Sequence, residues 1–305
     1  MSLALLLLPD FTLILLGLLL FKFTDWDASF WAGLEKLVYF VLFPCLLFYS
    51  TSRAPLDFHS TGKMLQVALL TCATGIGLGW LAKPLFRPGP MLFESGVQCA
   101  FRFNSFIALA VASRLAGDQG TALMALIIGF CVPLANFGAV HALVHRSGGL
   151  VRELIKNPLL IATLAGISCN LAGVVLPEFV ATTLSRIGSA SIAIGLMTVG
   201  AGLRLSAVYE GKSMAAYFIV VKLLALPMVA WLLGSAFGLP PLQLQIIVMF
   251  AALPTASSAY VLAARMGGNG PYVAFLISAG TLVSVLTLPV WLAVLQQGPL
   301  HVFAH

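Results

Sequence analysis

Landmarks in the first half of this chain recur about 150 residues later and in the same order. The matched pairs are Pro9 with Pro158, Leu34–Leu37 with Leu184–Ile187, Gly62–Lys63 with Gly211–Lys212, and Arg114–Gly117 with Arg265–Gly268. The spacing drifts by only one residue either way, which indicates two copies of one unit. In a strongly apolar chain, such a duplication is typical of secondary transporters, whose substrate site lies where the two units meet.

The composition predicts an integral membrane protein. Of the 305 residues, 60% are hydrophobic and only 9% are charged, whereas a soluble domain carries roughly 25% charged residues. The lipid bilayer is therefore an expected partner. The net charge of +6 lies mostly in loops on one face, which is an orientation signal. No aromatic and basic stripe suggests binding to nucleic acid.

Apolar stretches separated by Gly, Pro and charged residues predict ten membrane-spanning helices, each about 20 residues long. The predicted spans are 3–21, 33–51, 64–82, 95–113, 121–143, 158–176, 183–203, 213–234, 243–264 and 272–295. The first five form one repeat (1–145), a polar linker follows (146–157), and the last five form the second repeat (158–305). The N-terminal apolar run lacks a basic start and a cleavage site, so it is expected to be a first span and not a signal peptide.

The distribution of Lys and Arg predicts the orientation. Ten of the sixteen lie in or beside loops that follow odd-numbered spans, and four lie in loops that follow even-numbered spans. Both termini are therefore expected outside and the central linker in the cytoplasm. Because each repeat has an odd number of spans, the second repeat enters the membrane in the opposite sense. The expected fold is an all-α membrane protein of two inverted five-helix repeats.

Spans four and nine carry polar residues at matching depths. Span nine contains Pro254, followed by Thr255, Ser257 and Ser258, a pattern expected for a broken helix that lines a cavity. At the repeat offset, Asn104 in span four falls opposite Thr255, and Ser105 follows it. The alternative is an ordinary proline kink whose hydroxyl groups bond back to their own helix. The symmetry-matched Asn104 favours the broken helix.

Two cations lie deep in apolar sequence. Arg102 is in span four and Lys222 is near the middle of span eight. A charge at that depth costs about 2.5–3.5 kcal/mol on insertion scales, so it is a candidate functional group. No acidic residue is expected near mid-depth to neutralise either, and unpaired cations favour anionic substrates. Alternatively, Arg102 snorkels or caps carbonyls and Lys222 bonds to a neighbouring helix. Asn136 in span five lines the same cavity or forms an interhelical hydrogen bond.

Other motifs favour neither an enzyme nor a metal or cofactor site. His141 and His145 have the spacing of a metal pair, but no Glu base lies between them. The five cysteines are far apart within apolar stretches, as expected of packing residues. No P-loop, HExxH motif or paired Asp-rich motif is present. Pro44 and the small-residue run Gly195–Gly202 are expected to be helix-packing surfaces.

Four stretches resemble the auxin efflux carrier family. They are Leu34–Phe48, Lys156–Ala162 with Gly166, Ala252–Ser257 followed by Ala263, and Thr281–Ser284 before Pro289. The resemblance implies a scaffold of helices one, two, six and seven, and a transport part in which broken helices four and nine cross. It also implies a homodimer formed through the scaffold, and transport of small organic anions such as malonate, malate or auxin. Asn104 and Pro254 match the family's crossover residues, and Lys222 with Pro227 resembles a helix-eight pattern.

The chain departs from the family in two places. The proline that often follows the helix-four asparagine is missing, because Ala108–Val111 stands there. Span four is therefore expected to be less broken than span nine. The long hydrophilic central loop of many plant members is also missing, which suggests a carrier of a bacterial inner membrane. The interpretation is a secondary carrier of organic anions, elevator-like in mechanism. Its rivals are a sodium-coupled symporter of the bile-acid type and a membrane sensor that has lost transport.

Overall fold

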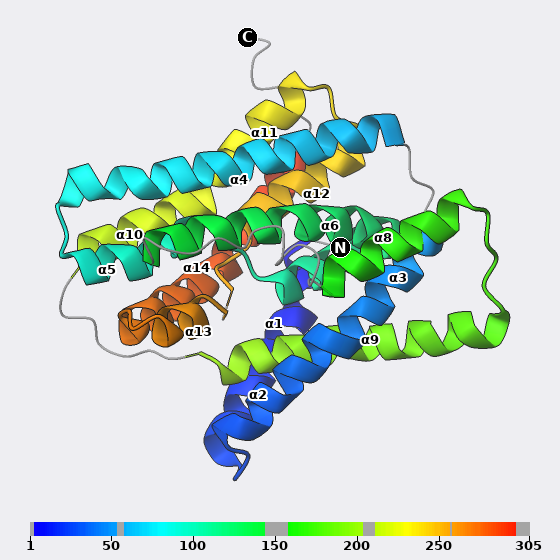
Figure 1. The fold of residues 1–305 in the computed structure, drawn as a ribbon, viewed down its shortest axis with the longest axis horizontal. Coiled ribbons are helices and arrows are strands. Elements are labelled where there is room, and N and C mark those ends of the chain that lie inside the picture. Colours follow the sequence, from blue (N-terminus) through cyan, green and yellow to red (C-terminus); the bar gives the residue numbers. More distant parts are fainter. Residues whose placement is uncertain (1–2, 54–57, 144–157, 204–210, 257, 297–305) are drawn as a thin grey trace.

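Helices make up all the regular structure in the part of the chain described by the computed structural model, which covers residues 3–53, 58–143, 158–203, 211–256 and 258–296 (Figure 1). The α-helices are α1 (Leu3–Phe23), α2 (Ala28–Leu37), α3 (Phe43–Arg53), α4 (Phe58–Phe86), α5 (Pro90–Gly96), α6 (Ser105–Leu143), α8 (Pro158–Leu171), α9 (Glu178–Ala201), α10 (Lys212–Val220), α11 (Leu226–Ala236), α12 (Pro241–Ala252), α13 (Ser258–Arg265) and α14 (Gly270–Gln296). Three short segments, η1 (Val38–Leu42), η2 (Val97–Ala100) and η3 (Val221–Ala225), have π or 3₁₀ geometry.

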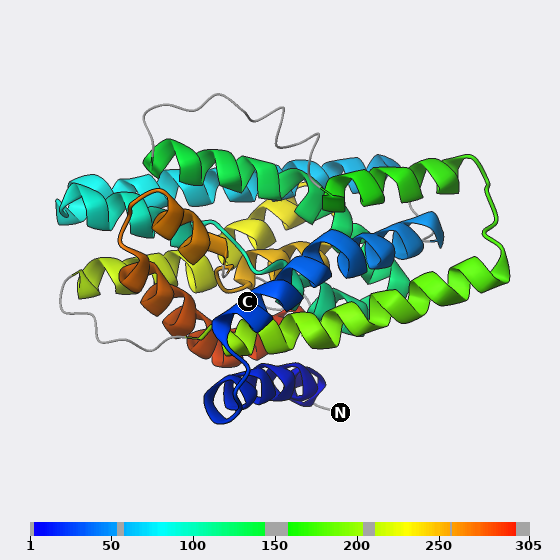
Figure 2. The same cartoon turned by 60° about the horizontal axis from the view of Figure 1, so that its bottom comes forward.

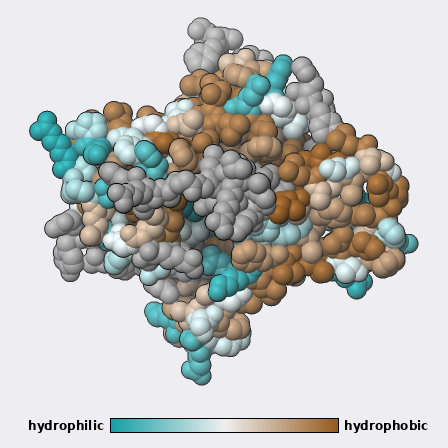
Figure 3. Space-filling view, viewed as in Figure 1, coloured by the Kyte–Doolittle hydropathy of each residue, from teal (hydrophilic) through white to brown (hydrophobic). Residues whose placement is uncertain are grey.

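Six helical segments of the described chain are long and apolar enough to cross a membrane. Five contain 24 to 26 residues, and the sixth, Pro90–Leu143, contains 54 and covers two of the predicted spans. Shorter apolar helices lie at Phe11–Phe23, Ile161–Leu171 and Pro241–Ala252. On the face shown in Figure 3, hydrophobic residues cover much of the surface between the helix ends. Hydrophilic residues gather at the helix ends. These features confirm an all-α, multi-pass membrane protein.

The helices pack in two groups. In one, α9 contacts α1, α2 and α3, and α3 also contacts α8. In the other, α4, α10, α11, α12, α13 and α14 pack together with α5. The long helix α6 contacts members of both groups and so connects them (Figures 1 and 2). The first group contains the four helices that the family resemblance assigns to a scaffold.

Glycines allow the closest approach within the first group. A Cβ atom at Gly17 of α1 would overlap the Met197 backbone of α9, and one at Gly200 of α9 would overlap the Ile14 backbone of α1. Outside this group, a Cβ at Gly195 would lie 3.3 Å from the Phe106 ring of α6. Small residues let helix backbones approach in this way. The prediction that Gly195–Gly202 is a packing surface is therefore confirmed.

Two prolines explain the two π segments. Pro44 and Pro227 have no N–H to donate, and their rings clash with the carbonyl four residues earlier. In the turn before each proline the helix widens, so that Phe43 N–H donates to the Val38 carbonyl and Leu226 N–H to the Val221 carbonyl. Pro227 leaves the Leu223 carbonyl without its usual donor, and the Trp291 indole nitrogen donates to that carbonyl at 2.9 Å. A side chain of α14 thus supplies the hydrogen bond that the helix lacks next to Lys222.

A glycine with positive φ recurs at the repeat offset. The non-helical backbone that divides α6 is at Ala116 and Gly117, and Gly117 has φ +54°. Gly267, 150 residues later, has φ +73° and follows α13. Glycine adopts this left-handed backbone at no steric cost. Both glycines therefore end the half-helix that follows a break. The predicted linker, 146–157, lies outside the described residues.

We predict that Trp291→Phe lowers the free energy of unfolding by about 1–3 kcal/mol, because it leaves the buried Leu223 carbonyl without the indole donor. The melting temperature of the purified protein in detergent measures this effect. Trp231→Phe is the matched control, since the Trp231 indole donates to none of the described residues. Equal melting temperatures for the two variants would contradict the role given to Trp291.

Candidate functional site

Both of the predicted broken helices are broken in the structure. Helix α12 ends at Ala252, residues 253–256 are not helical, and α13 begins at Ser258. In span four, η2 ends at Ala100, residues 101–104 are not helical, and α6 begins at Ser105. The expectation that span four is less broken because it lacks a proline was wrong. A proline is unnecessary where neighbouring groups satisfy the backbone that a break exposes.

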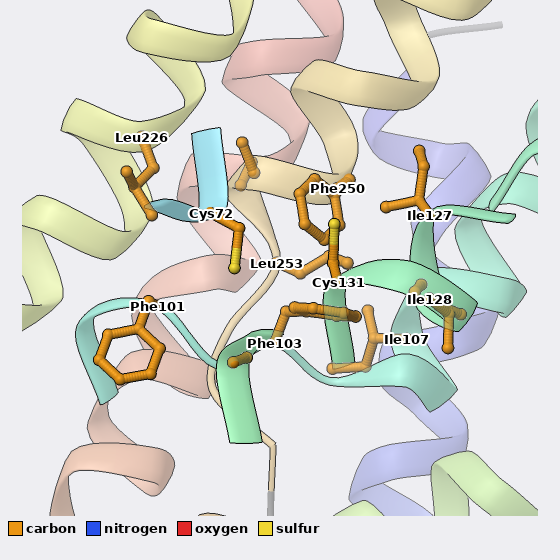
Figure 4. Close-up of a cluster of buried hydrophobic side chains, with 14 of the residues drawn as sticks. Cys72, Phe101, Phe103, Ile107, Ile127, Ile128, Cys131, Leu226, Phe250 and Leu253 are labelled. Carbon is orange, nitrogen blue, oxygen red and sulfur yellow. The ribbon is translucent and has the colours of Figure 1, made fainter. Parts of the chain in front are cut away.

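Each break provides hydrogen-bond partners for backbone groups that the other break exposes. The Asn104 N–H donates to the Pro254 carbonyl at 2.8 Å, and the Thr255 hydroxyl donates to the Cys99 carbonyl at 2.9 Å. Apolar contacts surround these bonds: the Phe103 and Phe250 rings meet edge to face at 4.7 Å, and Leu253 is fully buried (Figure 4). Phe101 and Phe103 lie on different sides of the first break (Figure 4). The two helices are therefore held together where they are interrupted.

Asn104 also starts the second half of its helix. Its side-chain oxygen accepts from the backbone N–H groups of Phe106 and Ile107, at 2.9 and 3.2 Å. Asparagine is among the best N-cap residues for this reason. Because the oxygen faces the α6 backbone, the amide nitrogen of Asn104 is left to face away from that helix. It is a hydrogen-bond donor at the positive end of the α6 dipole.

A cavity of about 180 Å³ lies against the two breaks. Five of the nine predicted site residues line it, together with Glu35, Tyr39 and several apolar side chains. The five are Arg102, Asn104, Ser105, Asn136 and Ser258. Within the described chain, the side chains of Ser105 and Asn136 have no hydrogen-bond partner. The cavity therefore offers polar groups that a small ligand can engage.

Arg102 is held at the edge of this cavity by residues that flank the two breaks. Its Nη2 donates to the Ser258 hydroxyl at 2.8 Å, and its Nη1 donates to the Gln98 side-chain oxygen at 3.3 Å. The side chain is 8% exposed. In a regular helix Arg102 and Asn104 would point to different faces, but the break lets both line one cavity. This places a permanent cation beside the N-terminus of α6.

Three other predicted site residues that the structure describes do not line this cavity. Lys222, Pro254 and Thr255 line a void of about 10 Å³ that shares no lining residue with the cavity. The Lys222 ammonium donates to the Ala251 carbonyl at 2.9 Å, in the last turn of α12. Lys222 thus caps the carbonyl end of a half-helix, where a cation is favoured. The two buried cations do not share one site. Ser257 lies outside the described residues.

Glu35 is the cavity residue that the sequence interpretation missed. Glu35 lies in the last turn of α2, near the start of the apolar stretch predicted as the span 33–51. Its position in the sequence therefore indicated the end of a span and not a cavity. The structure instead brings it to the cavity that Arg102 lines. The cavity of Arg102 therefore contains an acidic residue, although no ion pair joins the two among the described residues. One signal was available: Glu35 stands in a repeat landmark where the second copy has Ser185.

We predict that Thr255→Val lowers the free energy of unfolding by about 1–3 kcal/mol, because it removes the hydroxyl donor to the buried Cys99 carbonyl at nearly constant shape. Thr71→Val is the control, since the Thr71 hydroxyl bonds only within its own helix, to the Val67 carbonyl at 2.8 Å. Melting temperatures in detergent compare the two. A loss for Thr71→Val as large as for Thr255→Val would contradict a special role for the contact between the breaks.

Comparisons with known proteins find similarity to membrane transporters. Residues 141–292 match the protein family described as Membrane transport protein. The chain is 24% identical to the "Putative malonate transporter" of Rhizobium meliloti (strain 1021), over 97% of this chain and 96% of that protein. It is 26% identical to the uncharacterized transporter YfdV of Escherichia coli (strain K12), over 94% and 96% of the two chains.

A plant relative is similar over a shorter stretch. The "Probable auxin efflux carrier component 1b" of Oryza sativa subsp. japonica is 26% identical over 44% of this chain and 25% of its own length. The relatives thus include both bacterial transporters and plant auxin efflux carriers, as the four motifs indicated. Residues 141–292 are thus similar to the membrane transport protein family, and nearly the whole chain is similar to the bacterial transporters.

Proposed function

We propose that this protein is a secondary active carrier of small organic anions, and that the anion binds in the cavity beside the two breaks. The observation that carries the proposal is the placement of Arg102 and Asn104. A guanidinium group and an amide donor line one cavity at the N-terminus of α6. Cations, amide donors and helix N-termini all favour a carboxylate. The name of the Rhizobium relative supports a short carboxylate such as malonate.

The arrangement of the helices supports alternating access about the crossing of the two broken helices. The cavity and the smaller void both border residues of the second break: Ala256 lines the former, and Pro254 and Thr255 line the latter. Alternating access requires a binding site beside an element that can move, and the second break lies next to the cavity. We infer an elevator-like motion of the second helix group against the first, which acts as the scaffold and carries the interface of a homodimer.

The same proposal includes two inverted repeats, 1–145 and 158–305, joined by a cytoplasmic linker at 146–157. The breaks at 101–104 and 253–256 and the left-handed glycines Gly117 and Gly267 support the repeat, because each pair recurs at the same offset. The excess of Lys and Arg in loops after odd-numbered spans supports both termini outside a bacterial inner membrane.

Transport by proteoliposomes tests the proposal. We predict that Arg102→Gln reduces the uptake of labelled malonate by at least about tenfold, because a charge-assisted hydrogen bond in a site of low dielectric is worth about 1.5–3 kcal/mol. Arg102→Lys should retain part of the uptake, since it keeps the charge but loses the fork of donors. Arg186→Gln, which changes an exposed cation of α9, is the control and should transport like the wild type.

Three results separate the proposal from its rivals. Uptake by Arg102→Gln equal to that of the wild type would place the anion elsewhere. Uptake that requires sodium would indicate the symporter of the bile-acid type. Binding of malonate without any flux, in either direction and with either ion gradient, would indicate the sensor.

A further inference from the structure

Glu35 places a carboxylate in a cavity that we assign to anions. Its side chain is partly buried and lines the cavity with Arg102, Asn104 and Ser258. Within the described chain, no basic group lies within ion-pair distance of the carboxylate, and none of the hydrogen bonds there involves it. The Arg102 guanidinium, which also lines the cavity, donates to Gln98 and Ser258. Among the residues that the structure describes, Glu35 therefore has no partner that would explain a carboxylate at this position.

Few other charges face this carboxylate. Tyr39 of η1 and Arg102 share the cavity with it. Lys36 is its exposed neighbour on α2. Among the helices packed against α2, α9 contributes Glu178 and Arg186, and both are exposed. Arg102 is thus the cation that shares the interior of the cavity with Glu35, within the part of the chain that the structure describes.

The charge state of Glu35 then decides whether the cavity suits an anion. With Glu35 ionised, its charge offsets that of Arg102, and a carboxylate that enters meets a like charge in surroundings of low dielectric. With Glu35 protonated, the cavity keeps the positive charge of Arg102, and the neutral carboxyl group becomes a hydrogen-bond donor. A bound anion and a proton on Glu35 therefore stabilise each other. By linkage, the anion-bound protein holds its proton more tightly than the empty protein does.

We propose that Glu35 is a proton-binding site, and that an organic anion binds in the cavity together with one proton taken up by the Glu35 carboxylate. The proton comes from water or buffer and forms an O–H bond on the carboxylate, and the buffer base stays in solution. This proposal rests on the proposed function, since it requires an anion in the cavity. It makes anion binding stronger as the pH falls, with the proton and the anion as co-ligands.

Calorimetry of malonate binding to the purified full chain in detergent tests the proposal. Titrations in buffers of different ionisation enthalpy, repeated at a series of pH values, give the number of protons taken up per malonate bound. For the wild type we expect an uptake that approaches one proton, and an affinity that falls by about tenfold per pH unit over the window in which Glu35 titrates. Glu35→Gln imitates the protonated side chain, so its affinity should stay high and vary little with pH.

Glu178→Gln is the matched control, because it neutralises an exposed carboxylate on α9 outside the cavity, and it should behave like the wild type. Malonate itself also titrates, and the difference between the wild type and Glu35→Gln removes that contribution. Melting temperatures show whether each variant is folded. The measurement on the wild type alone still tests proton uptake if Glu35→Gln does not fold.

Each other outcome overturns the proposal in a distinguishable way. The same proton uptake in Glu35→Gln and wild type would assign the proton to another group. Malonate binding by the wild type without proton uptake would remove the proton site and leave the proposed function standing. Loss of binding in folded Glu35→Gln would show that the carboxylate is needed in its ionised form. Failure of the wild type to bind malonate or any other mono- or dicarboxylate would contradict the proposed function and this proposal with it.

Discussion

The structure depends on the contact between two interrupted helices. A break inside a membrane-spanning segment exposes backbone N–H and C=O groups, and each group left unsatisfied in hydrocarbon costs several kcal/mol. Here each break supplies partners for the other: Asn104 N–H bonds to the Pro254 carbonyl, and the Thr255 hydroxyl bonds to the Cys99 carbonyl. Neither helix could be interrupted at this place without the other. The mutual satisfaction of the two breaks explains why span four is broken although it has no proline at the break.

The two buried cations, Lys222 and Arg102, have different partners around this contact and so different roles. Lys222 donates to the Ala251 carbonyl and so stabilises the carbonyl end of α12. Arg102 instead bridges the two breaks at the edge of the cavity, where Asn104 and the start of α6 add further donors. The polar groups that complete the breaks and those that line the cavity therefore come from the same few turns. In the proposed carrier, a movement of one break would alter the binding site directly.

Much of this could be predicted from the sequence, for identifiable reasons. Proline and hydroxyl residues in apolar sequence, matched to Asn104 at the repeat offset, indicated both breaks, and five predicted residues lie in one cavity. The sequence could not show that Lys222 lies apart from Arg102, because depth along a helix does not tell which face is turned to which neighbour. It also could not show that Glu35 lines the cavity. Glu35 is distant in sequence from Arg102 and Asn104. It reaches the cavity only because of how α2 packs in the folded chain.

The central claim is that the cavity beside the crossing binds an organic anion. The most direct measurement is the rate at which a membrane-impermeant thiol reagent labels a cysteine placed at Ser105, which lines this cavity at the first residue of α6. The variant Ser105→Cys is made in a background without the five native cysteines. The account predicts that malonate slows the labelling in a saturable way, and that a cysteine at exposed Ser189 of α9 is unaffected. Labelling of Ser105→Cys that no mono- or dicarboxylate changes would contradict it.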